Sequence, residues 1–350
     1  MAFSLVAGIA ISAAALYFAF RNVPFSELIH YFKTINYFWM LVSLGIVVIS
    51  FVVRVLRWQV ILRTSAKISF WRAYHPMMIG FMLNCILPAR VGELARPAVL
   101  QQKDGVPFTT GLATVATERL FDLFLLILLF AVVLSYVEID PDIEMTFGTY
   151  HLNRATLMAI GGGMIKISLV LIFGIALVTI DPIRKRIRMI IMKIPNFFFF
   201  AGSRIKQAIA TYFCLPLVGI IENIASGFGL LKDFKNISIC IFFSLTIWLL
   251  QALSYYVMTF GCPGVELSFF EATTVLIIIC FFIALPSVPG FWGLWEAGGV
   301  FALSLFAVTA KEASGFALAS HAVQMFPVII VGLISVLVYG VKIRQIKYER

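Results

Sequence analysis

Charged side chains lie within the apolar parts of this sequence, where they could hold a charged ligand away from water. A charge at the centre of a bilayer costs at least about 2.5 kcal/mol, so such residues usually have a partner or a function. Arginine suits phosphate, because its planar guanidinium donates two parallel hydrogen bonds and stays charged when partly desolvated. We predict a site for a phosphate-bearing group built from Arg90, Glu93, Arg96, Glu118, Arg119, Asp122, Glu296 and His321.

Some of these charged residues could instead pair with one another inside the protein. Glu118 and Asp122 are one helical turn apart, with Arg119 beside them, so the three could share a face turned to the protein interior. Arg119 could then either bind a ligand or pair with Glu93, Glu118 or Asp122 and brace the fold. The sequence leaves both roles open.

Catalysis is not expected at this site. The carboxylate pair could do acid–base chemistry, but no nucleophile, metal cluster or cofactor loop accompanies it, and the four histidines are far apart in the sequence. We therefore predict no enzymatic activity, no metal and no cofactor. His321 stays a candidate for binding because it lies within the last apolar segment.

Two clusters of proline and glycine interrupt the apolar segments that carry these charges. Gly92 and Gly293 can each begin a short helix whose free amides favour an anion. Glu93 and Glu296 lie in the first turns, so they could cap those amides, or bind a proton, a cation or a headgroup amine. The predicted tips contain Asn84, Pro88 and Gly92 in the first cluster, and Pro286, Pro289, Gly290 and Gly293 in the second.

The elements that position these residues are membrane helices. The chain is 61% hydrophobic and 13% charged, with a mean hydropathy of +1.01, and its apolar runs show no strand-like alternation. Spanning segments are expected at 1–20, 37–53, 120–137, 155–180, 236–260 and 313–341. Shorter, broken segments lie at 73–88, 92–103, 208–231, 272–286 and 292–309.

The distribution of basic residues predicts the topology. Basic residues at 54–72, at 184–206 and after 341 indicate cytoplasmic segments, whereas the acidic loop at 138–144 and the loop at 21–36 are placed outside. The net charge of +10 then reflects topology and anionic lipid headgroups, and no nucleic-acid partner is expected. Trp39, Trp58 and Trp71 are expected at the membrane interface, and the cysteines, without CxxC spacing, as packing residues.

This topology predicts a re-entrant hairpin in the first half. Segment 73–118 must return to the side that it left, and 92–103 is too short and too charged to cross, so the tip at 88–92 lies at membrane depth. The second pair, 272–286 and 292–309, could cross fully or re-enter, and its re-entrant interpretation rests on its likeness to the first tip. The segment 208–231 is expected as an interfacial helix.

The expected architecture is therefore an all-α polytopic membrane protein with an inverted repeat, whose two re-entrant hairpins meet near the bilayer midplane. One domain, 1–350, would contain repeat halves at about 37–180 and 208–341. The cell membrane is the expected location, with the C-terminus cytoplasmic.

A set of short motifs resembles a known family. The motifs are Leu56-Arg57-Trp58, Asn84 with Leu87-Pro88, Gly92-Glu93 and Arg96, Gly105-Val106-Pro107, Glu118-Arg119-Leu120 with Asp122, and Pro286, Pro289-Gly290, Gly293 and Glu296-Ala297. In this order they resemble the flippase-like membrane domain of lysylphosphatidylglycerol synthases, over most of the chain. The chain departs from that pattern at His321 and Gln324, where relatives often have an arginine, and shows no counterpart of the soluble aminoacyl-transferring domain.

The resemblance implies lipid translocation without naming the lipid: aminoacyl-phospholipids, polyprenyl-linked sugars and hopanoid-type lipids are all handled by relatives. The leading hypothesis is a flippase for an anionic or phosphate-bearing lipid. The alternative is a non-transporting scaffold that delivers such a lipid to a separate synthase or glycosyltransferase, and a membrane-embedded transferase is a third. Expected partners are anionic membrane lipids and a lipid-modifying enzyme. Without a nucleotide-binding loop, transport would need an ion gradient, the membrane potential, lipid consumption or a partner.

Overall fold

The structure is a computed structural model of the whole chain. It describes all residues except 1, 22, 89, 137–144, 148–149, 153–161, 164–165, 167–168, 171–172, 174–179, 198–201, 228–232, 286–287 and 341–350. The predicted span 155–180, the acidic loop at 138–144, the basic C-terminus and the tip residue Pro286 therefore lie wholly or largely outside the described residues.

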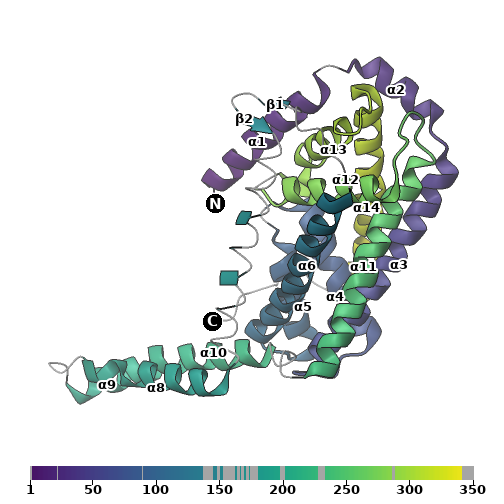
Figure 1. Ribbon diagram of the computed structural model, residues 1–350. Helices are drawn as coiled ribbons and strands as arrows, with labels where there is room; N and C mark the ends of the chain where they lie inside the picture. Colours follow the sequence, from purple (N-terminus) through teal and green to yellow (C-terminus); the bar gives the residue numbers. More distant parts are fainter. Residues whose placement is uncertain are drawn as a thin grey trace.

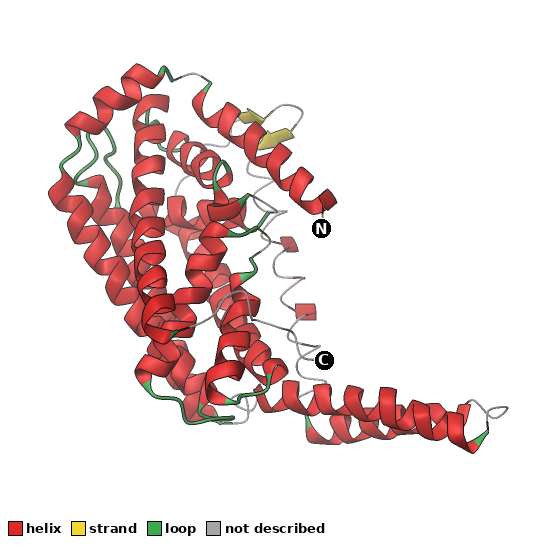
Figure 2. Ribbon diagram, turned by 180° about the vertical axis from the view of Figure 1, so that it is seen from behind, coloured by secondary structure: helices red, strands yellow, loops and turns green. Residues whose placement is uncertain are grey.

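Helices dominate the described part of the chain, as predicted (Figures 1 and 2). The first half contains α1 (Ala2–Phe20), α2 (Phe25–Thr34), α3 (Tyr37–Leu62), α4 (Phe70–Ile86), α5 (Gly92–Asp104) and α6 (Phe108–Tyr136). The second half contains α8 (Asp181–Phe197), α9 (Ser203–Ile209), the π-helix η1 (Ala210–Cys214), α10 (Leu215–Gly227), α11 (Phe234–Thr259), α12 (Phe269–Ile283), the 3-10 helix η3 (Pro289–Phe291), α13 (Leu294–Ser304) and α14 (Ala310–Tyr339). Between the halves, β1 (Met145–Phe147) and β2 (Tyr150–Leu152) pair antiparallel, with Thr146 opposite His151.

Three helices are long and apolar enough to cross a membrane among the described residues: α3, α11 and α14. Their starts are set by local chemistry, since Asn36 accepts a hydrogen bond from the Phe38 amide (3.1 Å) before α3 and Asp233 from the Lys235 amide (3.0 Å) before α11. Helices suit this composition, because a helix satisfies its own backbone in lipid. The chain is a multi-pass membrane protein.

Each broken apolar pair folds as two packed helices joined by a short turn. The first is α4 followed by α5, and the second is α12 followed by η3 and α13. The first pair is closely packed, because a Cβ on Gly92 would collide with the carbonyl oxygen of Gly80 on α4. α4 also packs against α14, and α13 packs against both α14 and α1.

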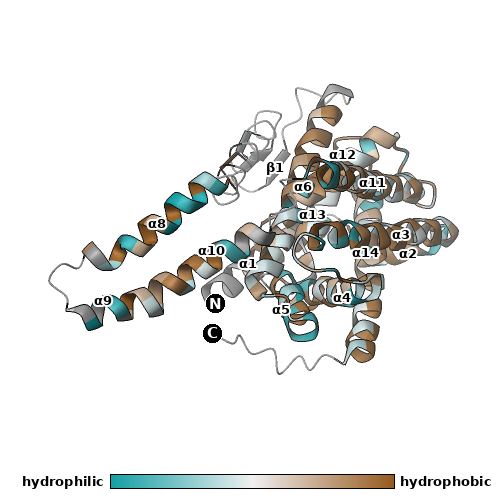
Figure 3. Ribbon diagram, turned by 90° about the horizontal axis from the view of Figure 1, so that it is seen from below, coloured by the Kyte–Doolittle hydropathy of each residue, from teal (hydrophilic) through white to brown (hydrophobic). Residues whose placement is uncertain are grey.

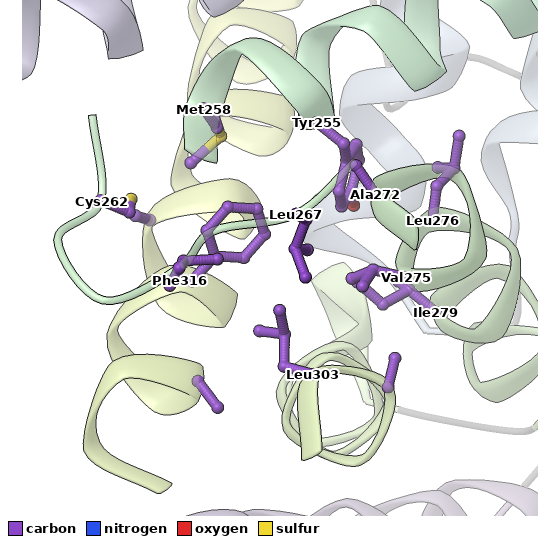
Figure 4. Packing of buried hydrophobic residues seen from close by; sticks show 14 of the residues in the cluster. Tyr255, Met258, Cys262, Leu267, Ala272, Val275, Leu276, Ile279, Leu303 and Phe316 are labelled. Atoms are coloured by element: carbon purple, nitrogen blue, oxygen red, sulfur yellow. The ribbon is translucent and has the colours of Figure 1, made fainter. Parts of the chain in front are cut away.

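An apolar core joins the second pair to its neighbours. Figure 4 shows Tyr255 and Met258 of α11, Val275 and Ile279 of α12 and Phe316 of α14 meeting in one cluster. Cys262 packs in the same cluster, and all five cysteines are free. The expectation that cysteines are packing residues is confirmed at Cys214, Cys240 and Cys262, which are buried.

Three predicted boundaries were wrong. The loop at 21–36 contains α2, which buries Leu28 and Tyr31, and the Tyr31 hydroxyl donates to the Pro263 carbonyl (2.9 Å). The basic segment at 184–206 lies mostly in the helices α8 and α9. The helix predicted from residue 120 begins at Phe108, because partners in the interior compensate the charges in its first half.

The helices α8, α9, η1 and α10 form an arm that extends sideways from the helical body (Figures 1 and 3). Ile191 of α8, Cys214 of η1 and Val218 of α10 form its apolar seam. At its base, the Thr110 hydroxyl of α6 donates to the Asn223 carbonyl (3.3 Å). The segment 208–231 was expected as an interfacial helix. Its described residues supply most of the second half of a helical hairpin, whose first half is α8.

Candidate functional site

A buried ionic cluster ties four helices together beside the first hairpin. Arg57 of α3 contacts Asp122 (Nη1–Oδ1, 2.6 Å) and Glu118 (Nη2–Oε1, 3.3 Å), both on α6. Arg96 of α5 contacts the other oxygen of Glu118 (Nη2–Oε2, 2.6 Å), and Arg57 also donates to the Ser244 hydroxyl of α11 (2.8 Å). The four charged residues are buried. Two guanidiniums and two carboxylates balance each other, so the cluster braces the fold.

Trp58 belongs to this cluster and is not an interfacial anchor, which corrects that prediction. Its side chain is buried, its indole nitrogen donates to the Thr114 hydroxyl of α6 (3.1 Å), and the Arg96 guanidinium carbon lies 4.1 Å from its ring centroid. The apolar ring and the cation share a dry site. Trp71, by contrast, is 64% exposed.

Sequence reasoning missed Arg57 as an interior residue, as well as Arg54 on the same helix. Both were placed in a cytoplasmic basic segment, but they lie inside α3. Their spacing of three residues sets them on one side of a helix, and Glu118 and Asp122 on α6 have a similar spacing. Matching these two patterns is the signal that could have found the cluster.

A cavity of about 260 Å³ lies where the two hairpin turns meet. The first hairpin contributes Asn84, Arg90 and Glu93 to its lining, and the second contributes Gly290 and Phe291. Longer helices complete it with Arg54 of α3, Arg119 of α6, Gln251 of α11, and His321 and Gln324 of α14. Residues from both halves of the sequence therefore share one cavity.

Arg90 links the two turns directly. Its Nη2 donates to the carbonyl of Ile283 at the end of α12 (2.8 Å), and its guanidinium carbon lies 5.5 Å from the ring centroid of Phe291. Arg90 and Phe291 both have positive φ, 53° and 61°, a conformation that costs energy without glycine. The two turns thus hold each other in an uncommon backbone shape beside the cavity.

Arg119 takes part in the ionic network and also faces the cavity. It contacts Glu93 (Nε–Oε1, 3.6 Å) and Asp122 (Nη1–Oδ2, 3.3 Å), while its side chain is 39% exposed. Both roles left open by the sequence are therefore compatible with its position. Glu93, at 28% exposure, is the carboxylate among the described cavity-lining residues.

Glu296 and His321 form a hydrogen-bonded dyad that supports the second turn. One oxygen of Glu296 accepts from the Gly293 amide (2.7 Å) at the start of α13, as predicted for a cap, and the other lies 2.6 Å from His321 Nδ1. His321 Nε2 lies 2.8 Å from the Gly290 carbonyl, which only accepts, so Nε2 carries a hydrogen. His321 therefore joins the Gly290 carbonyl to the Glu296 carboxyl group.

Two tryptophans enclose this dyad. The Trp295 ring stacks on His321 at a centroid distance of 4.7 Å and an angle of 8°, and Trp292 lies at 4.4 Å. Gly290 and Gly293 have φ of 71° and 90°, which a residue with a Cβ rarely adopts. A Cβ on Gly293 would collide with the Ser12 carbonyl oxygen of α1, and a Cβ on Gly290 would press on the Cys85 carbonyl oxygen of α4 (3.1 Å), so glycine lets the turn approach both helices.

The predicted site residues therefore fall into two groups. Those that line the cavity are Arg90, Glu93, Arg119 and His321, with Asn84 and Gly290 from the turns. Those buried behind it are Arg96, Glu118 and Asp122 in the ionic cluster, and Glu296 behind His321. Of the remaining tip residues, Pro88 lies in the first turn, Gly92 begins α5, Pro289 begins η3 and Gly293 precedes α13. Among the described residues, no group of three side chains could hold a metal ion.

The sequence matches known proteins over nearly its whole length. Residues 5–332 match the family described as lysylphosphatidylglycerol synthase TM region. The chain is also 26% identical over 370 residues to Glycosyltransferase AglD of Haloferax volcanii, covering 97% of this chain and 55% of that protein. It thus spans about half the length of this curated relative. Together with the motifs in both hairpins, the family match identifies the chain as a member of the lysylphosphatidylglycerol synthase transmembrane-region family.

Proposed function

We propose that this protein moves a phosphate-bearing lipid between the two leaflets of the cell membrane. The headgroup would enter the cavity between the two hairpin turns, while the acyl chains stay in lipid. One observation carries the proposal: Arg54 and Arg90 line the cavity, and neither forms an ion pair with a carboxylate of the described residues. Such cations in a partly desolvated cavity favour an anion.

The arrangement of the hairpins supports a route through the membrane. We propose that α4–α5 enters from the cytoplasm and that α12–α13 enters from outside. The two hairpins would belong to inverted repeats that extend over about 37–180 and 208–341. The contact from Arg90 to the Ile283 carbonyl supports turns that meet at one depth. In this topology the C-terminus is cytoplasmic. Non-helical turns are tolerated at that depth because protein and the cavity surround them.

The site residues would act at three levels. Arg54, Arg90 and Arg119 would contact the phosphate oxygens, and Glu93 would restrain Arg119. Arg96, Glu118 and Asp122 would hold the hairpin and α6 in place. The Glu296–His321 dyad would hold the second turn in place beside the headgroup.

A reconstituted transport assay tests this function. Full-length protein in liposomes should accelerate the exposure of fluorescent phosphatidylglycerol to an external quencher. Arg90→Gln should slow transport at least about tenfold, the equivalent of losing one charge-assisted hydrogen bond. Arg63→Gln, which removes an exposed charge that does not line the cavity, is the matched control. Wild-type protein that leaves the rate unchanged for anionic phospholipids would refute the proposal.

A scaffold that presents lipid to another enzyme is the second candidate. The similarity to a protein named as a glycosyltransferase, of which this chain spans about half, favours it. On that proposal the chain binds lipid without moving it, and in neither case does it catalyse group transfer itself. Co-purification with a transferase, together with inactive liposomes, would support the scaffold, whereas product formed by the isolated protein would identify an enzyme.

A further inference from the structure

We infer that the cavity selects a phosphate lipid whose headgroup is otherwise uncharged, such as a polyol, and rejects headgroups with free amines. The inference rests on the proposed binding of a lipid headgroup in this cavity. It concerns the part of the headgroup beyond the phosphate, which the proposed function leaves open.

The charges that line the cavity are unequal. Arg54, Arg90 and Arg119 face it with Glu93 as the carboxylate among the described lining residues. Glu93 is already 3.6 Å from Arg119. A phosphate would reduce the positive excess, whereas a protonated amine would add to it.

The neighbouring carboxylates are not available to an amine. Both oxygens of Glu296 are engaged, one by the Gly293 amide and the other by His321, and its side chain is fully buried. Asp122 contacts Arg57 with one oxygen and Arg119 with the other. Among these carboxylates an ammonium group could therefore use Glu93, and it would have to share Glu93 with Arg119.

Much of the remaining lining is apolar, including Phe51, Leu276 and Val328, and its neutral polar side chains, Asn84, Gln251 and Gln324, suit hydroxyl groups. Gln324 donates to Gln251 (3.0 Å) and Ser254 (3.3 Å), so its amide nitrogen is engaged. Asn84 Oδ1 and Trp248 Nε1 are buried at the cavity without a hydrogen-bond partner among the described residues. One is an acceptor and the other a donor, and a hydroxyl can satisfy either.

Competition between two lipids with the same phosphate tests the inference. Full-length protein is placed in phosphatidylcholine nanodiscs with equal amounts of phosphatidylglycerol and lysyl-phosphatidylglycerol, and the lipids that stay bound are measured by native mass spectrometry. Wild-type protein should retain phosphatidylglycerol at least about tenfold over the lysyl lipid. Gln324→Glu, which adds a carboxylate to the cavity, should reduce or reverse this preference. Gln102→Glu, the same change at an exposed position outside the cavity, should not.

The outcomes separate this inference from the proposed function. Equal retention of the two lipids, preference for the lysyl lipid, or retention of neither above phosphatidylcholine would overturn the inference. If phosphatidylglycerol is transported in liposomes but retained no better than the lysyl lipid, the proposed transport is supported and the inferred headgroup preference is refuted. If phosphatidylglycerol is preferentially retained but not transported, the inferred headgroup preference is supported and the proposed transport is refuted. The wild-type comparison decides the result should Gln324→Glu fail to fold.

Discussion

Glu296 Oε1 lies 2.6 Å from His321 Nδ1, and through this contact the last long helix holds the turn of the second hairpin. Glu296 reaches back to the Gly293 amide, and His321 reaches forward to the Gly290 carbonyl. One side-chain pair therefore fixes both ends of a turn that contains two glycines with positive φ.

The first prediction concerns this pair. His321→Ala should lower the free energy of unfolding by about 1–3 kcal/mol, because it leaves a buried carboxylate oxygen without its partner. Glu296→Gln combined with His321→Gln should recover part of that loss, since two amides can hydrogen-bond to each other. Thermal unfolding of the purified variants measures both. Equal loss in the single and double variants would contradict the coupling.

The second prediction compares two arginines on α3. Arg57→Gln should destabilise the protein by about 3–5 kcal/mol, because it removes the buried cation that joins Asp122 to Glu118 and leaves one oxygen of each without its partner. Arg54→Gln, three residues earlier, should cost much less, since Arg54 forms no ion pair with the described carboxylates. It should instead reduce lipid retention. Denaturant or thermal unfolding, paired with lipid measurement, distinguishes the two, and similar losses of stability would refute the assignment.

The third prediction concerns the first hairpin. Gly92→Ala should sharply reduce the yield of folded protein and its thermal stability, because the new Cβ would collide with the Gly80 carbonyl oxygen. Gly45→Ala in α3 is the matched control, since nothing lies within 4 Å of its added Cβ. The control should gain up to about 1 kcal/mol from helix propensity. A tolerated Gly92→Ala would show that α4 and α5 are packed less closely.

The fourth prediction concerns the arm formed by α8, α9, η1 and α10. Tyr212 and Phe213 are 83% and 56% exposed, and exposed basic residues such as Lys185 and Arg186 accompany them. We expect this face to lie in an anionic membrane interface. A fluorophore at Tyr212→Cys, in a chain with its five cysteines replaced, should shift to the blue in phosphatidylglycerol bilayers and less in phosphatidylcholine. The same label at Gln102→Cys serves as the control, and identical water-like spectra at both positions would exclude the interfacial position.

Much of the helical framework could be predicted from hydropathy, because a membrane helix must be apolar for most of its length. The breaks at Pro88 and at Pro289 also fell between packed helices, since proline and glycine end helices locally. Helix boundaries near charges were less predictable. The start of α6 at Phe108 depends on partners from other helices, Arg57 of α3 and Arg96 of α5.

The kinds of residue in the site were predicted better than their arrangement in space. The cavity is lined by Arg90, Glu93, Arg119 and His321, as predicted. Arg96 and Glu118 instead form an ion pair with each other behind it. Which arginine meets a carboxylate depends on tertiary packing, and a sequence pattern cannot show it. Arg54 and Gln251 were missed for the same reason, since an apolar helix hides which of its polar residues faces a cavity.

The ionic cluster also constrains how the chain is made. Glu118 and Asp122 enter the bilayer on a helix synthesised after the one that carries Arg57, so their cation is already in place when they arrive. Inserted alone, α6 would bring Glu118 and Asp122 into hydrocarbon with Arg119 of the same helix as their one cation, and an unpaired carboxylate there costs about 2.5 kcal/mol or more. Insertion of α6 is therefore helped when α3 is already in the membrane, and a chain that lost Arg57 should yield less folded protein.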